Sequence, residues 1–478
     1  MNEDFDDMDF DDIEELMSHF EKMIDEGSYY FFDLEDLEDI IDQYLISNDK
    51  KRSEQAISFA MAQYPNAWGI LLRKAQYLLY DNKSRQALGI LERIENIEPD
   101  NPDVFMAKGY VYSQMKNFDK AIEEFDKALE YTDEPENLLM SIVYELENRG
   151  LYDKAIEYLK DVLKINAENE AALYEISFCF DFTSRDEDAI LFFNDFLNKN
   201  PYSATAWFNL GLAYNSLELY EKAIESYDFV IAIDETFASA YFNKANSWAN
   251  MGMYREAIEN YRQTFLYEDP ESSTYFYLGE CYMKLEQFHT AIEYYQKAID
   301  LDPNMADSWF NMGVAYNEIA MAKDALRCIE KAVESDKENM EFLLELAQLY
   351  GQSGQFENAV IAYEKLMLSD NKNPNVWNMY AGLLYDYDDM AGAVSLLRNA
   401  IKKMPKEASL VYRLAAYLYN GNQIQESLRM IEKALSINYE AFEEIYLLAP
   451  GMPENPEVIA LLESMKPLNV RKKRKPQQ

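Results

Sequence analysis

Apolar and small side chains recur at intervals of three and four residues through much of the chain. Residues 272–305 show the pattern well, in the sequence SSTYFYLGECYMKLEQFHTAIEYYQKAIDLDPNM. One face of a first helix would carry Tyr275, Leu278, Gly279 and Tyr282, and one face of a second would carry Phe288, Ala291, Tyr295 and Ala298. This spacing is typical of amphipathic helices. Pro303 follows where the second helix must end, because proline cannot continue a helix.

The same pattern returns every 34 residues. One place in the period is alanine ten times in succession, at Ala87, Ala121, Ala155, Ala189, Ala223, Ala257, Ala291, Ala325, Ala359 and Ala393. Ser427 takes the next place, and Gly109, Gly211, Gly279 and Gly313 share another. A 34-residue period indicates repeated helix-turn-helix units. It predicts eleven contiguous units over residues 68–441, preceded by a shorter, degenerate unit at residues 37–67.

In its period and its small, aromatic and proline positions, the chain resembles the tetratricopeptide repeat (TPR) family. The resemblance covers about four-fifths of the chain. It implies an all-α fold, a right-handed superhelical solenoid of tandem helix-turn-helix units. It also implies that the first helices line a concave groove where a protein or an extended peptide binds. A repeat family specifies a scaffold and not a ligand.

Aromatic and asparagine residues cluster on the first helices of the central units, which makes them candidates for the groove. The candidate peptide-binding residues are Tyr174, Phe208, Asn209, Asn215, Phe242, Asn243, Asn246, Asn250, Phe276, Phe310, Asn311 and Asn317. An asparagine amide can pair with a peptide backbone of any sequence, and aromatic pockets can hold its side chains. The same pattern also serves packing between units, and both interpretations stay open.

The two ends differ from the repeats. Residues 1–12 are too acidic to bury a core and are expected to form a disordered tail, followed by an N-terminal cap helix and connector over residues 13–36. Residues 442–466 predict C-terminal capping helices. Residues 467–478 predict a basic flexible tail containing RKKRK, either a solvated tail or a patch for nuclear import or an anionic surface.

The net charge of −43 bears on partners. Residues 1–42 alone carry −17. Such acidity repels phosphate backbones, so we expect no nucleic acid on the solenoid. It favours a basic protein or peptide partner, although acidic residues also keep a long rod soluble. A second hypothesis follows: an acidic, chaperone-like or sensor protein for basic partners, regulated by its own N-terminus with Phe5, Met8 and Phe10.

An enzyme is not expected. There are only two histidines, His19 and His289, and no phosphate-binding loop, HExxH motif or Cys/His zinc cluster. We therefore expect no cofactor and no metal. Three widely spaced cysteines suit a reducing compartment, no apolar run is long enough to span a membrane, and the N-terminus has no secretory signal. The sequence predicts a cytoplasmic, non-enzymatic protein–protein interaction scaffold.

Overall fold

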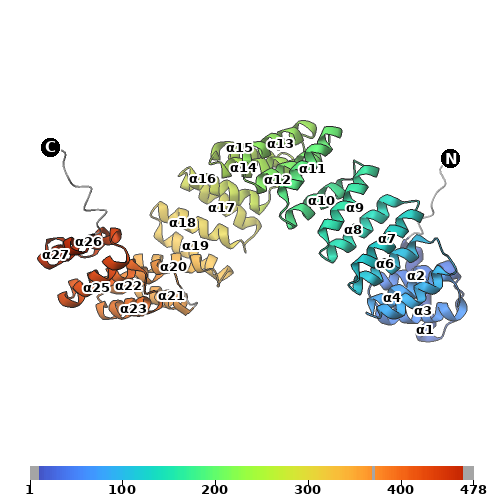
Figure 1. Ribbon diagram of the computed structural model, residues 1–478, viewed down its shortest axis with the longest axis horizontal. Helices are drawn as coiled ribbons and strands as arrows, with labels where there is room; N and C mark the ends of the chain where they lie inside the picture. The colour runs from blue at the N-terminus through green and yellow to red at the C-terminus, as the bar shows by residue number, and fades with distance from the viewer. Residues whose placement is uncertain (1–9, 369–371, 467–478) are drawn as a thin grey trace. The chain divides into compact units, whose positions relative to one another are not determined.

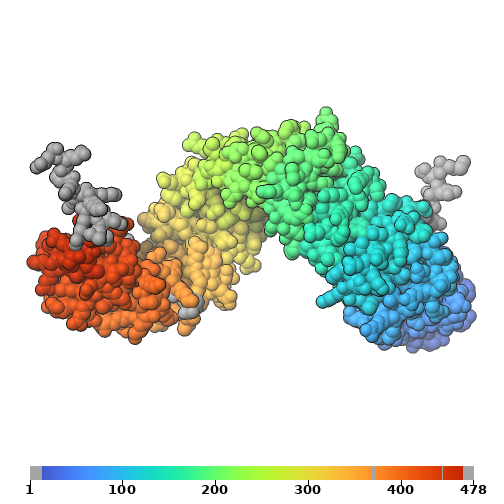
Figure 2. Space-filling view, viewed as in Figure 1, coloured from blue at the N-terminus to red at the C-terminus, as the bar shows by residue number. Residues whose placement is uncertain are grey.

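The computed structural model describes residues 10–368 and 372–466, and within these ranges it contains helices and turns but no strand (Figure 1). The chain divides into two compact units, residues 1–240 and 241–478. The boundary falls inside helix α14 (Ala238–Asn250). Figure 2 shows that side chains fill the spaces between successive helices within each unit, so neighbouring helix pairs form one packed body.

The helices follow one another in tandem. Unit 1 contains α1 (Phe10–Glu26), α2 (Leu34–Ile46), α3 (Lys50–Gln63), α4 (Trp68–Tyr80), α5 (Ser84–Glu95), α6 (Pro102–Gln114), α7 (Phe118–Tyr131), α8 (Pro135–Asn148), α9 (Tyr152–Ile165), α10 (Glu170–Phe182), α11 (Asp186–Lys199), α12 (Ala204–Ser216) and α13 (Tyr220–Ile233). Unit 2 contains α15 (Tyr254–Thr264), α16 (Ser272–Lys284), α17 (Phe288–Leu301), α18 (Ala306–Glu318), α19 (Ala322–Ser335), α20 (Met340–Gln352), α21 (Phe356–Leu368), α22 (Pro374–Asp386), α23 (Met390–Lys403), α24 (Ala408–Asn420), α25 (Ile424–Ile437), η1 (Glu440–Glu444), α26 (Ile445–Leu448), η2 (Met452–Glu454) and α27 (Pro456–Met465).

The alanine register marks where the two helices of a pair meet. From α2 to α25, even-numbered helices are the first and odd-numbered helices the second of each pair. The ten alanines lie on second helices with at most 3% of their surface exposed, and Ser427 is fully buried in the eleventh place. Only a small side chain fits this close approach, because overpacking strains a core. The predicted all-α array of helix-turn-helix units is confirmed.

The glycine register lies opposite a large buried residue of the second helix. A Cβ atom on Gly109 would stand 2.2 Å from Cε1 of Phe125, and one on Gly211 would stand 2.5 Å from Cε1 of Tyr227. Gly279 faces Tyr295 in the same way, at 2.6 Å. The glycine therefore makes room for the aromatic ring that fills the centre of each of these pairs.

Left-handed turns join the two helices of every pair. Positive φ values recur every 34 residues, at Asn48, Asn82, Lys116, Gly150, Ser184, Glu218, Gly252, Glu286, Ala320, Gly354, Asp388 and Asn422. At Ala320, the amide donates to the Asn317 carbonyl and the next amide, that of Met321, donates to the Tyr316 carbonyl, both at 2.9 Å. These bonds satisfy carbonyls that the end of α18 leaves open. The turn fixes the register of each pair even where glycine is absent.

The ends differ in part from the expected boundaries. Helix α1 begins at Phe10, inside the segment expected to be a disordered tail, while residues 1–9 lie outside the described residues. Phe20 of α1 is fully buried against Phe32, Tyr44 and Phe59. Helix α2 begins at Leu34, before the start expected at residue 37. Its N-cap, Asp33, forms a reciprocal capping box with Asp36, and such a box starts a helix.

Beyond α25, short helices cover the last pair. Ile445, Met452 and Val458 are fully buried, and the Tyr412 hydroxyl donates to the Asn438 carbonyl at 2.7 Å. The predicted tail with RKKRK, residues 467–478, lies outside the described residues.

Candidate functional site

Three pockets open along the first helices of unit 1. We call the surface formed by α2, α4, α6, α8, α10 and α12 the first-helix face of unit 1. The N-terminal pocket, of about 630 Å³, is lined by Asp42, Leu45, Ile46, Gln76, Leu79, Tyr80, Tyr110, Gln114, Glu145 and Arg149. A second pocket, of about 460 Å³, shares Asp42, Gln76 and Tyr110 with it. The central pocket, of about 560 Å³, is lined by Tyr174, Glu175, Ser177, Phe178, Asp181, Asp186, Ala189, Asn209, Leu212, Ala213, Asn215 and Ser216.

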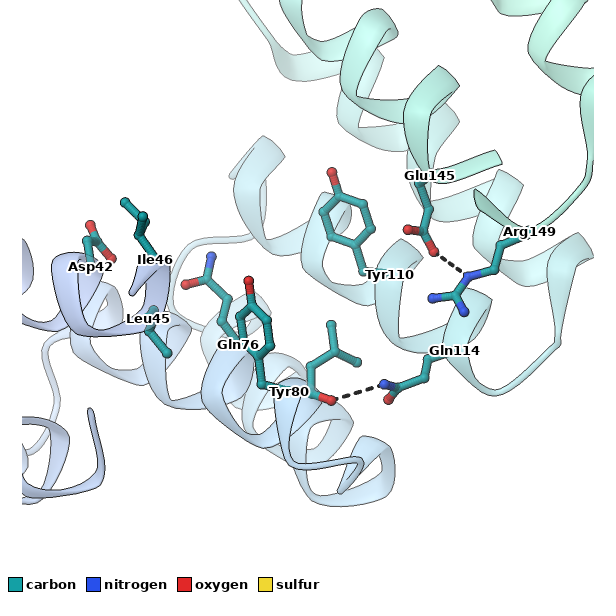
Figure 3. A pocket seen from close by; sticks show the side chains of 10 residues that line it. Asp42, Leu45, Ile46, Gln76, Tyr80, Tyr110, Gln114, Glu145 and Arg149 are labelled. Atoms are coloured by element: carbon teal, nitrogen blue, oxygen red, sulfur yellow. Dashed lines mark hydrogen bonds and ion pairs between the residues drawn. The ribbon is translucent and has the colours of Figure 1, made fainter. Parts of the chain in front are cut away.

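The N-terminal pocket combines exposed apolar side chains with polar groups that are held in place (Figure 3). Ile46 and Tyr80 expose 76% and 58% of their surface. Glu145 accepts a hydrogen bond from Arg149 at 2.8 Å, and Gln114 donates to the Leu79 carbonyl at 3.0 Å. Apolar anchors beside oriented polar groups are the usual composition of a binding pocket.

The second pocket, of about 460 Å³, contains a cationic side chain, Arg73. Arg73 donates to Glu38 at 2.9 Å and to Asp42 at 2.6 Å. Burial is the main reason why the pKa of Glu38 lies above its ordinary value, although Arg73 acts in the opposite direction. Burial also raises the pKa of Tyr110 to about 12, so this phenol stays neutral and can act as a donor. Two of the acidic groups of this pocket, Glu38 and Asp42, are therefore already paired with an arginine.

The central pocket has a different electrostatic character. Tyr174 and Phe178 expose 42% and 48% of their surface. Glu175, Asp181 and Asp186 form no ion pair with any residue in the described ranges, and none of the lining residues is a lysine or arginine. The central pocket therefore joins two aromatic rings to three carboxylates that lack a cationic partner in the described part of the chain.

Asn209 belongs to the wall of the central pocket but is fully buried. Its side-chain Nδ2 donates to the Leu173 carbonyl of α10 at 2.9 Å. Its Oδ1 accepts no hydrogen bond from any residue that the structure describes. Asn209 thus holds α12 against α10, which supports the packing interpretation for this residue, while one acceptor atom stays unused.

Most other sequence-predicted site residues also contact neighbouring helices. Phe208 is buried against Tyr227 and Phe237, with ring centroids 5.9 and 5.1 Å apart. The remaining contacts of this kind join Phe242 to Tyr261 and Tyr277, Phe276 to Tyr277 and Tyr295, and Phe310 to Phe342. Asn246 accepts a hydrogen bond from Tyr261. The phenylalanines are therefore part of the packing within and between pairs.

The sequence-predicted set is divided between the two units. The structure brings Tyr174, Asn209 and Asn215 together in the central pocket of unit 1. In unit 2, Asn250 is exposed, whereas Asn243, Asn311 and Asn317 are half-buried. Sequence reasoning missed Ile46, Tyr80 and Tyr110, which lie at other places of the repeat. The sequence did offer one signal for this pocket: Ile46 and Tyr80 are apolar residues at the C-terminal ends of two successive first helices.

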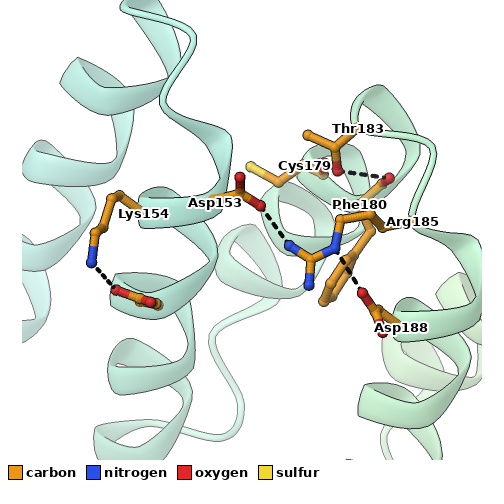
Figure 4. Close-up of polar contacts among 8 residues, drawn as sticks. Asp153, Lys154, Cys179, Phe180, Thr183, Arg185 and Asp188 are labelled. Carbon is orange, nitrogen blue, oxygen red and sulfur yellow. Dashed lines mark hydrogen bonds and ion pairs between the residues drawn. The ribbon is translucent and has the colours of Figure 1, made fainter.

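A further pocket, of about 720 Å³, lies beside the second helices α9 and α11. Figure 4 shows its edge, where Arg185 donates to Asp153 and, at 2.7 Å, to Asp188. Near by, Cys179 donates to Glu147 at 3.2 Å, and burial raises the pKa of this thiol. A protonated, buried thiol is unreactive, and Arg185 already has counter-ions. This second-helix pocket is therefore the weaker candidate.

Comparison with known families identifies the repeats. Family models of the tetratricopeptide repeat match residues 102–134, 137–169, 204–237, 272–305, 294–327 and 320–383. The chain is therefore a tetratricopeptide repeat protein, as its 34-residue period predicts. The repeats make it a protein-interaction scaffold in the general sense of this family.

Several solved structures are similar to the chain at low sequence identity. The C-terminal part of a TPR repeat-containing protein from Cytophaga hutchinsonii is 18% identical, with a TM-score of 0.45, over 53% of this chain and 99% of its own. The APC/C hetero-tetramer Cut9–Hcn1 is 16% identical, with a TM-score of 0.38, over 86% of this chain and 92% of its own. YrrB, described as a TPR protein with an unusual peptide-binding site, is 21% identical, with a TM-score of 0.34, over 41% of this chain and 97% of its own.

No curated protein matches the chain significantly. Within residues 10–368 and 372–466, no helix is long and apolar enough to cross a membrane. In the same ranges, no three His, Cys, Asp or Glu side chains are grouped so that they could hold a metal ion.

Proposed function

We propose that the chain is a non-enzymatic scaffold that binds an extended peptide or protein segment along the first-helix face of unit 1. The observation that carries the proposal is the run of three pockets on this face, each lined by consecutive first helices. Peptide side chains would enter the pockets while the backbone lies across the helices. Catalysis has no part in this function.

The composition of the pockets supports this mode of binding. Ile46 and Tyr80 offer exposed apolar surface to a side chain, and buried apolar anchors carry most of the energy in many interfaces. Gln76 lies beside them with an amide that can serve a peptide backbone. Because packed helices preform these pockets, binding loses little conformational entropy.

Unit 2 offers a separate place for peptide contact. Phe242, Asn243 and Asn250 belong to α14, and the half-buried Asn311 and Asn317 belong to α18. We keep these residues as proposed peptide contacts of unit 2. Phe242 also packs against neighbouring helices, so loss of binding in a Phe242 variant is evidence for a peptide contact only if the helices remain folded.

The experiment is affinity purification from the native cell with the intact chain and three variants. Ile46→Ser with Tyr80→Ser removes the apolar anchors of the N-terminal pocket. Ile97→Ser with Tyr202→Ser is the matched control, since these exposed residues lie in turns after the second helices α5 and α11. Phe242→Ala with Asn243→Ala tests unit 2.

The proposal expects a partner that is lost with the Ile46 and Tyr80 changes and retained with the control. Circular dichroism must show unchanged helix content for every variant. Loss only with the Phe242 and Asn243 changes would move the site to unit 2. A partner retained by all three variants would refute binding both at the first-helix face of unit 1 and at the proposed peptide contacts of unit 2.

A further inference from the structure

We propose that the central pocket receives a cationic side chain, arginine or lysine, from a basic segment of the partner. This inference rests on the proposed function, because it names the chemistry that one part of the first-helix face recognises. Three independent features of the pocket carry it: its aromatic rings, its carboxylates and the unused acceptor of Asn209.

The aromatic rings present faces on which a cation can lie. Tyr174 and Phe178 are four residues apart on α10, and each exposes almost half of its surface beside the pocket. Side chains four apart on a helix are neighbours. The negative face of an aromatic ring attracts guanidinium and ammonium groups, with a gain of about 0.5–2 kcal/mol. The apolar stem of arginine or lysine can pack on the same rings.

The carboxylates supply charge that the described part of the chain does not neutralise. Glu175 and Asp181 come from α10, and Asp186 opens α11. Asp186 is partly compensated by the positive end of its own helix, whereas Asp181 stands near the negative end of α10. Charge-assisted hydrogen bonds to a carboxylate are roughly twice as strong as neutral ones. An incoming cation would therefore gain most from Glu175 and Asp181.

Asn209 adds a neutral acceptor to the wall of the pocket. Its Nδ2 is engaged by the Leu173 carbonyl, and its Oδ1 accepts nothing from the described residues. A buried acceptor without a donor costs about 1–3 kcal/mol. A guanidinium group, with five N–H donors, can satisfy this oxygen and a carboxylate together.

The other three pockets described above lack this combination. In the pocket beside α4, Arg73 already neutralises Glu38 and Asp42. In the N-terminal pocket, Arg149 pairs with Glu145. In the second-helix pocket, Lys164 pairs with Asp161 and Lys199 with Asp195. Among the four pockets described, only the central one combines aromatic rings and carboxylates with no arginine or lysine in its lining.

The test measures binding of a defined peptide to the full chain by fluorescence anisotropy. The probe is a labelled dodecapeptide of alanine and serine with two arginines. Its control carries citrulline in place of arginine, which keeps the shape and removes the charge. The pocket variant combines Glu175→Gln, Asp181→Asn and Asp186→Asn.

The matched control variant combines Glu187→Gln, Glu221→Gln and Glu225→Gln. It removes the same charge from exposed positions of the second helices α11 and α13. This control separates the pocket from the general attraction that a net charge of −43 exerts on any basic peptide.

The arginine peptide should bind at least about tenfold more tightly than the citrulline peptide. The pocket variant should lose about tenfold in affinity and the control variant much less. Tyr174→Leu with Phe178→Leu keeps apolar volume without ring faces, and it should weaken binding about fivefold.

Equal losses in the pocket and control variants would overturn the inference, since only net charge would then matter. Equal binding of the two peptides would overturn it as well. If neither peptide binds but partner capture still depends on Ile46 and Tyr80, this inference fails and the proposed function stands. If capture is also independent of those residues, both fail.

Discussion

Substitution of Gly109 by alanine tests the packing logic of the repeat. The new Cβ would lie 2.2 Å from Cε1 and 2.4 Å from Cδ1 of Phe125. The Phe125 ring is fully buried and packs edge-on against Tyr110, with centroids 5.7 Å apart. The ring cannot rotate into solvent, so α6 and α7 must move apart to admit the methyl group.

The expected loss follows from two opposing effects. Overpacking a core costs about 1–3 kcal/mol. Alanine has a helix propensity about 0.8–1.0 kcal/mol better than glycine, which offsets part of that cost. The 2.2 Å separation places the overpacking cost in the upper part of its range, so we expect Gly109→Ala to lower the free energy of unfolding by about 1–2 kcal/mol. Gly89 of α5 has nothing within 4 Å of its Cβ position, so Gly89→Ala should raise it by about 0.5–1 kcal/mol.

A second change identifies the cause. In the preceding pair, Ala75 and Leu91 occupy the places of Gly109 and Phe125, and both are buried. Gly109→Ala with Phe125→Leu reproduces that combination. The double variant should therefore be more stable than the sum of the two single effects predicts, by about 1 kcal/mol or more.

The assay must report locally, because long repeat arrays need not unfold in one step. Hydrogen exchange followed by mass spectrometry gives the opening free energy of α6 and α7. A loss of 1–2 kcal/mol corresponds to exchange about 5–30 times faster. If Gly109→Ala protects these helices as Gly89→Ala protects α5, the steric reasoning is wrong. Additive effects in the double variant would show that Phe125 is not the obstacle.

Further substitutions test three other features. Lys108 is 6% exposed and lies 2.8 Å from Glu124, which also pairs with Lys127. Because Lys127 remains as a partner of Glu124, Lys108→Met should cost about 1–3 kcal/mol in urea unfolding, and Lys108→Met with Glu124→Met should recover part of it. Burial raises the pKa of Glu345 above its usual 4.5, so the folded chain binds this proton more tightly than the unfolded chain. Glu345→Gln should therefore raise the melting temperature at pH 7 and lose that advantage below about pH 4.5, which melts over a pH series would show. Ala320→Gly should stabilise its left-handed turn by about 1 kcal/mol, and Gly354→Ala should cost a similar amount, both read from chemical unfolding.

Periodicity predicted the helix pairs because packing makes the same demand in each of them. Ala87 and its equivalents are small for one physical reason, so their spacing was visible without a structure. The left-handed turns were not visible, since only Gly150, Gly252 and Gly354 among them are glycine. Lys116 and Glu218 adopt the same backbone because the flanking helices impose it, and no residue type signals this.

The site was less predictable than the fold. Asn209 and Asn215 are both asparagines of α12, yet Asn209 is fully buried and bonded to α10 whereas Asn215 is half-buried beside the pocket. Their roles depend on how α10 and α12 approach each other. Tyr80 and Ile46 lie at the C-terminal ends of α4 and α2, outside the aromatic and asparagine cluster of the central units that pointed to a groove. Exposure, which decides whether a side chain can meet a partner, is a property of the packed array.

The evenly spaced left-handed turns make the chain divisible. Lys116 and Gly150 lie 34 residues apart and have the same left-handed backbone conformation. Excision of residues 116–149 would place Gly150 directly after Met115, so Met115 would still be followed by a left-handed turn. Removal of 33 or 35 residues would instead rotate the following helix by about 100° and expose its apolar stripe. Length can thus change in whole repeats without new joints, and the number of pockets offered to a ligand can change with it.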